Sequence, residues 1–272
     1  MAKCYAVASG KGGVGKSTIT ANLAAALSSQ GNRVIVIDAD IGLRSLDALL
    51  SLENRVVYDI IDLLNGECTL PEALLQTETY PSLHLLAAAQ FARAKELDPK
   101  RFRKLIDSLQ SMSDYIFIDC PAGVERGFRN VINTGVDEII LVVTPDDISL
   151  RSAEKAAQVI GAKSMIRPFL IVNRLQNDLI QRNEMMSART VADTLDLPLL
   201  GEIPEDPVVY RSVYQHALFI RFVSEARDAV FRISYRVQGK SIAFPAYGTQ
   251  KIPLFRRLFG NALKEVKPID DH

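Results

Sequence analysis

The run CYAVASGKGGVGKSTIT, residues 4–20, decides the fold of this 272-residue chain. It reads as a short apolar strand, a glycine-rich loop and the start of a helix. Within it, residues 10–17 have the spacing G-x-x-x-x-G-K-S of a phosphate-binding loop. Glycines let backbone N–H groups close around phosphate oxygens, and the helix N-terminus adds a partial positive charge. The run therefore predicts a nucleotide site between the first strand and the first helix.

We expect two side chains of this loop to carry the phosphate chemistry. Lys16 should reach the β and γ phosphates, and the Ser17 hydroxyl should ligate Mg²⁺. The residues expected to contact the nucleotide are Gly10, Lys11, Gly12, Gly13, Val14, Gly15, Lys16, Ser17 and Thr18.

The rest of the chain alternates apolar, β-branched runs with helical patterns, which predicts an α/β fold. The strand-like runs are almost wholly apolar rather than alternating, as in parallel strands covered on both faces. We therefore expect a doubly wound, mainly parallel sheet. The predicted strands are 4–9, 33–38, 83–88, 115–119, 138–144, 169–173 and 199–203. The predicted helices start at the end of the glycine loop and near 98–112, 149–161, 187–196, 206–216 and 223–236.

Composition narrows the class of protein. Lys plus Arg total 32 and Asp plus Glu total 32, so no net positive field favours nucleic acid as a partner. The three cysteines, Cys4, Cys68 and Cys120, show no paired metal spacing, which is typical of a reduced, cytoplasmic chain. The N-terminus has no room for a signal-peptide core, and no apolar run reaches the ~18 residues of a membrane span. Any membrane contact is expected at the surface.

Acidic side chains stand where two predicted strands end. Asp38 and Asp40 close the second strand and share a face, and Asp119 closes the run YIFID. Ligands bind at the carboxyl edge of open parallel sheets, so these carboxylates are candidates for the same site. One of the first two has the alternative role of a helix or turn cap.

The motif KGGVGKS, residues 11–17, resembles that of the deviant Walker A family of ATPases. The segments DIGLRSLD (40–47), RVVYD (55–59), DCPAG (119–123), IPED (203–206) and FRRLFG (255–260) are similar to those of its septum-site-determining members. The resemblance implies binding of ATP with Mg²⁺ and an ATP-dependent homodimer. It also implies that Lys11 reaches the phosphates bound by the other subunit, a cation delivered in trans. The alternative for Lys11 is an ordinary solvated loop lysine.

The same resemblance implies roles for the remaining site residues. Catalysis falls to Lys11, Lys16 and Asp40, with Asp40 positioning the attacking water. Ser17, Asp38 and Asp119 lie at the metal. The base is bound by Asn173, Arg174, Pro204, Glu205 and Asp206, although turn or cap roles for Glu205 and Asp206 stay open.

Three segments divide the chain: an ATPase domain over 1–240, a Pro- and Gly-containing linker over 241–252, and an amphipathic segment over 253–272. One helical side of the last segment carries the predicted membrane contacts Leu254, Phe255, Leu258, Phe259 and Leu263, and the other side is basic. A helix docked on the domain's own core is the alternative. Two weak tails held in one dimer would attach more firmly than one.

The resemblance implies a cytoplasmic ATPase that is peripheral on the inner face of the cell membrane and that positions the division septum. Its implied partners are a MinC-type division inhibitor, a MinE-type or other topological regulator, and an anionic membrane surface. Alternatives are a flagellar number regulator of the FlhG type, a DNA-binding ParA-type partition ATPase, and an iron-sulfur carrier, which needs paired cysteines. The chain departs from its relatives at Ser45, where they have asparagine, and at Ser152, where they have aspartate.

Overall fold

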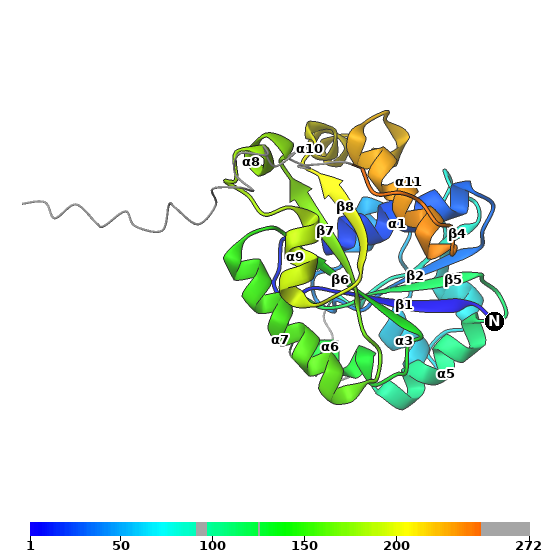
Figure 1. Cartoon of the computed structure of the whole chain (residues 1–272). Coiled ribbons are helices and arrows are strands. Elements are labelled where there is room, and N and C mark those ends of the chain that lie inside the picture. The colour runs from blue at the N-terminus through cyan, green and yellow to red at the C-terminus, as the bar shows by residue number, and fades with distance from the viewer. Residues whose placement is uncertain (91–96, 125, 246–272) are drawn as a thin grey trace, which may run out of the picture.

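The computed structural model describes residues 1–90, 97–124 and 126–245 of the chain. The strands in this part form one eight-stranded sheet (Figure 1). Its order is β3-β4-β2-β5-β1-β6-β7-β8, and every neighbouring pair is parallel except β3 with β4. The strands are β1 (Lys3–Ala8), β2 (Val34–Asp38), β3 (Leu74–Gln76), β4 (Leu83–Leu86), β5 (Tyr115–Asp119), β6 (Glu138–Val143), β7 (Phe169–Leu175) and β8 (Leu199–Pro204). The doubly wound α/β prediction is confirmed.

The longer helices match the predicted ones: α1 (Lys16–Ser29), α5 (Pro99–Leu109), α7 (Asp147–Lys163), α9 (Ala188–Leu195), α10 (Pro207–Tyr214) and α11 (Glu225–Val237). Shorter helices escaped the sequence analysis: α2 (Ser45–Leu49), α3 (Ile60–Asn65), α4 (Leu70–Ala73), α6 (Arg126–Ile132), α8 (Asn177–Gln181) and the 3-10 turn η2 (Phe219–Arg221). Segments this short have too few turns to show a helical period. The strand β3 was also missed, because three residues are too few to show a strand pattern.

Helices cover both faces of the sheet, which explains why its central strands are almost wholly apolar (Figure 1). Along β1, Tyr5 and Val7 pack on the side of α1 and α11. Cys4 and Ala6 pack on the opposite side, with α5, α7 and α9. Successive side chains of a strand alternate between faces, so each strand supplies both cores.

The strand register brings the candidate site together at the carboxyl edge. Asp38, the last residue of β2, is in register with Asp119, the last residue of β5. β5 also pairs with β1, whose carboxyl end leads into the glycine loop. The loop and two acidic strand ends therefore share one edge.

The domain continues past α11 into the first residues of the predicted linker. Arg236 donates from Nε to the carbonyl of Ile242 (3.1 Å) and from Nη2 to that of Ala243 (3.0 Å). Its guanidinium lies 3.7 Å from the ring centroid of Phe244. The predicted membrane contacts Leu254, Phe255, Leu258, Phe259 and Leu263 lie outside the described residues. In the described part of the chain, no helix is both long and apolar enough to cross a membrane.

Candidate functional site

The glycine loop between β1 and α1 has a conformation that glycine makes possible. Gly13 and Gly15 have φ angles of 79° and 93°, in the left-handed region that side chains disfavour. Position 10 requires glycine for a different reason: a Cβ there would lie 2.2 Å from the backbone carbonyl of Ser152 in α7. The loop is therefore held in close contact with that helix.

Asn173, at the end of β7, supports the loop from the other side. Its Nδ2 donates to the carbonyl oxygen of Val14 at 2.8 Å. A Cβ on Gly15 would lie 2.5 Å from the same amide nitrogen. The predicted base-binding residue thus also fixes the shape of the phosphate loop.

Lys16 forms a buried ion pair with Asp119. Its Nζ lies 2.9 Å from Asp119 Oδ1, and the two side chains are 6% and 0% exposed. Burial by itself lowers the pKa of Lys16, but the Asp119 carboxylate outweighs that effect and the pKa is raised, so the ammonium stays charged. Thr20 also donates to Asp119 Oδ1, at 3.2 Å. In the described structure the second oxygen, Oδ2, is buried without a hydrogen-bond partner.

Asp38 and Asp40 differ in what their carboxyl groups contact. Asp38 is buried and accepts the backbone N–H groups of Asp40 and Leu46, each at 3.0 Å. It therefore stabilises the turn that leads into α2, the cap role that the sequence left open. Burial and the neighbouring Asp119 raise the pKa of Asp38 to about 7. Burial also raises the pKa of Asp40, against the opposing effect of Lys16.

Lys11 is paired within its own chain. Its Nζ lies 2.9 Å from Oδ1 of Asp146. Asp146 is the N-cap of α7 and accepts the backbone N–H of Ser149 at 2.9 Å. Burial acts to raise the pKa of Asp146, but hydrogen bonds from Thr144 and Lys11 outweigh it and the pKa is lowered. The pair ties the loop to the start of α7, and both side chains remain partly exposed.

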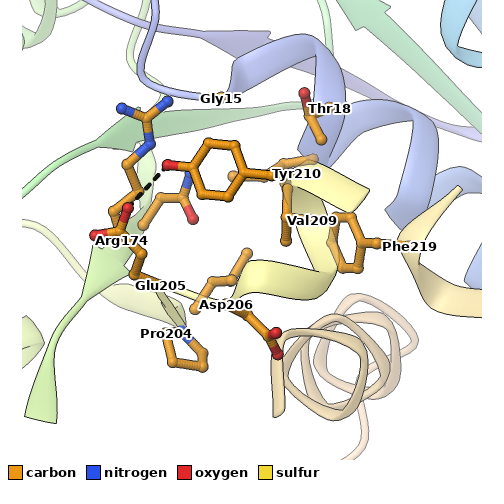
Figure 2. A pocket seen from close by; sticks show the side chains of 12 residues that line it. Gly15, Thr18, Arg174, Pro204, Glu205, Asp206, Val209, Tyr210 and Phe219 are labelled. Carbon is orange, nitrogen blue, oxygen red and sulfur yellow. Dashed lines mark hydrogen bonds between the residues drawn. The ribbon is translucent and has the colours of Figure 1, made fainter. Parts of the chain in front are cut away.

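An open pocket of about 470 Å³, part of it shared with solvent, lies beside the loop (Figure 2). Gly15, Thr18, Ile19, Asn173, Arg174, Ile203, Pro204, Glu205, Asp206, Val209, Tyr210 and Phe219 line it. All five predicted base-binding residues are among them.

Two of those residues also have structural roles. Asp206 caps α10 by accepting the N–H of Val208 at 2.9 Å, and it accepts the N–H of Ala226 in α11 at 3.2 Å. Glu205 accepts hydrogen bonds from Tyr210 Oη at 2.9 Å and from Gln176 Nε2 at 2.8 Å. The sequence analysis missed Tyr210. The sequence signal that could have found it is its position about one helical turn after Asp206, which caps the same helix.

The oxygen ligands at the carboxyl edge suit Mg²⁺, which prefers carboxylates, hydroxyls and phosphates. Asp119 has a buried, unpartnered oxygen, and Ser17 offers a hydroxyl 3.4 Å from Lys16 Nζ. Among the described residues, no group of three or more His, Cys, Asp or Glu side chains is placed to hold a metal by itself. Such a site fits a metal that takes part of its ligands from a bound triphosphate.

The cysteines do not form a site. Cys4 and Cys120 are buried and Cys68 is half-buried, and all three are free thiols. Burial raises the pKa of Cys4 to about 12, and it raises that of Cys120 still further. Cys120 is therefore a core residue, and the structure offers no exposed cysteine pair within the described residues.

Comparison with known proteins places this arrangement in a family. A family model described as "ParA: NUBPL iron-transfer P-loop NTPase" matches residues 1–237. The chain is 40% identical over 266 residues to the septum site-determining protein MinD of Synechocystis sp., covering 96% of this chain and 100% of that protein. The chain belongs to the MinD family of P-loop NTPases.

Solved MinD structures share the fold. The MinC:MinD cell division protein complex of Aquifex aeolicus matches with a TM-score of 0.81 at 34% identity, over 90% of this chain and 99% of that one. The MinD of Pyrococcus horikoshii, solved with Mg-ADP, matches with a TM-score of 0.77 at 29% identity, over 87% and 96% of the two chains. The resemblance seen in the loop thus extends over the described domain.

Proposed function

We propose that this chain is a Mg²⁺-dependent ATPase that positions the division septum. In this proposal its ATP-bound homodimer attaches peripherally to the inner face of the cell membrane and recruits a MinC-type inhibitor. ATP hydrolysis, stimulated by a MinE-type or other topological regulator, then releases it. The observation that carries the proposal is the Lys16–Asp119 pair, placed where the glycine loop meets the carboxyl edge of the sheet.

Nucleotide binding would exchange one partner of Lys16 for another. In the structure the ammonium is neutralised by Asp119 at 2.9 Å. Phosphate oxygens in the loop would take the lysine, which leaves the Asp119 carboxylate for the metal. Mg²⁺ would neutralise phosphate charge there, and Ser17 and Asp119 would hold it while Asp38 supports the adjacent turn.

Besides Lys16, the proposed catalytic residues are Lys11 and Asp40. Asp40 lies near Lys16 at the mouth of the site, where it would orient the attacking water. Lys11 would leave Asp146 and contact the phosphates bound by the second subunit. Such a cation acts on the charge that develops during phosphoryl transfer. Dimerisation and hydrolysis would then depend on the same residue.

Light scattering with Mg²⁺ and a non-hydrolysable ATP analogue tests the proposal. The wild-type mass should double from 30.1 kDa with the analogue and stay unchanged with ADP. Lys16→Ala should remain a monomer, because it loses the charge that binds the phosphates. Asp40→Ala should form the dimer but hydrolyse ATP at least ~100-fold more slowly, the loss typical of a missing general base.

Lys104→Ala is the matched control, since Lys104 is an exposed lysine on α5, outside the site. It should behave like the wild type. Dimer formation by Lys16→Ala, or full turnover by Asp40→Ala, would contradict the assigned roles.

A further inference from the structure

Tyr210 closes one side of the base pocket. It projects from α10 beside the pocket, and Figure 2 shows its hydroxyl directed at the carboxylate of Glu205. Tyr210 is 58% exposed as a residue, so the fold does not need it in the core. An exposed aromatic side chain that is nevertheless held in one orientation suggests a binding role.

Glu205 holds that orientation by joining three elements. It accepts Tyr210 Oη at 2.9 Å through one oxygen and Gln176 Nε2 at 2.8 Å through the other. Gln176 follows β7, Glu205 follows β8, and Tyr210 lies in α10. We call this chain of hydrogen bonds the Tyr210 bridge. It links two strand ends and a helix beside the pocket and holds the ring in one orientation.

The pocket has apolar side chains on several sides of Tyr210. Ile19, Val209 and Phe219 supply apolar walls from α1, α10 and η2. Gly15 and Thr18, from the loop and the first turn of α1, connect the pocket to the phosphate site. A nucleotide with its phosphates in the loop would therefore have its base beside Tyr210.

We propose that Tyr210 is a nucleotide-binding residue that stacks on the base, with Glu205 and Gln176 as positioning residues. This inference rests on the proposed nucleotide-binding function. Stacking on an aromatic ring stabilises a bound base, and an aromatic that is already oriented loses little entropy on binding. Tyr210 thus contributes to affinity for the base and makes no contact with the phosphates.

Competition against a labelled ATP analogue in the presence of Mg²⁺ separates these contributions. The competitors are ATP and inorganic tripolyphosphate, which has the phosphates but no base. Tyr210→Ala should weaken ATP about tenfold, the effect expected for one lost aromatic stack, and leave tripolyphosphate unchanged. Tyr210→Phe keeps the ring and loses one hydrogen bond, so its ATP affinity should fall by about threefold or less.

Tyr214→Ala serves as the matched control, because Tyr214 lies one turn further along α10, is 88% exposed and does not line the pocket. It should bind both competitors like the wild type. Equal ATP affinity for Tyr210→Ala and the wild type would overturn the inference, and so would an equal loss for ATP and tripolyphosphate. If the wild type binds ATP and Lys16→Ala does not, these failures leave the proposed function standing. If the wild type binds no ATP, both proposals fail.

Discussion

At the scale of single residues, the three thiols differ in their surroundings, and this difference predicts their reactivity. Burial raises the pKa of Cys4 to about 12 and that of Cys120 higher, so neither forms a thiolate near neutral pH. Burial followed by the charge of Asp62 also raises the pKa of Cys68, but that side chain is only half-buried. Only Cys68 should therefore react in the folded protein.

Iodoacetamide at pH 8 followed by mass spectrometry checks this expectation. The folded protein should gain label at Cys68 alone, and protein unfolded in urea should gain it at all three positions. Labelling of Cys4 or Cys120 at the rate of Cys68 in the folded state would contradict the burial seen here. It would also reopen the possibility of cysteine-based cluster chemistry.

At the scale of elements, the glycine loop and α7 behave as one packed unit. A Cβ on Gly10 would meet the backbone of Ser152 at 2.2 Å and that of Ala153 at 2.7 Å. Backbone atoms cannot move aside like the end of a side chain, so the loop and helix must separate. We expect Gly10→Ala to lower the free energy of unfolding in urea by about 1–3 kcal/mol, the usual cost of overpacking.

Gly161→Ala on the same helix is the control for Gly10→Ala. No atom lies within 4 Å of a Cβ placed at Gly161, which has ordinary helical geometry. Alanine is the better helix former there, so stability should rise by roughly 0.5–1 kcal/mol. If Gly10→Ala were as stable as the wild type, the close contact between the loop and α7 would not exist in solution.

At the scale of the whole molecule, the segment after the domain is expected to connect ATP binding to membrane attachment. Sedimentation with anionic liposomes should pellet the wild type with Mg-ATP and leave it in the supernatant with ADP. Phe255→Glu should stay in the supernatant in both cases, because it loses the burial of a phenylalanine in the lipid, a contribution of up to about 1.5–3 kcal/mol. The two tails of a dimer would both lose this contribution. The variant should still dimerise, because Phe255 is not one of the predicted nucleotide-binding residues.

Asn261→Glu controls for the added charge, since residue 261 is predicted on the polar side of the same segment. It should pellet like the wild type apart from a small electrostatic loss. Unchanged pelleting of Phe255→Glu would favour the alternative in which the segment docks on its own domain.

Several features of this protein follow from the sequence alone because their causes are local. A strand buried on both faces is almost wholly apolar, so β1, β2, β4, β5, β6, β7 and β8 were recognisable one at a time. The loop was recognisable because phosphate binding needs glycines and a lysine at fixed spacing. The proximity of the acidic ends of β2 and β5 was predictable because the carboxyl ends of parallel strands lie at the same edge of the sheet.

Only the tertiary structure decided which of these groups are partners. Lys16 pairs with Asp119 and Lys11 pairs with Asp146, and both carboxylates are more than a hundred positions away in the chain. The tertiary structure also decided the packing of Gly10 on α7 and the hydrogen bond from Gln176 to Glu205, which joins the ends of two strands. These contacts depend on how the crossover helices bring strand ends together, and no pattern within one segment contains that distance. Apart from Tyr210, the residues of the candidate site were therefore predictable from the sequence, and their pairing required the folded chain.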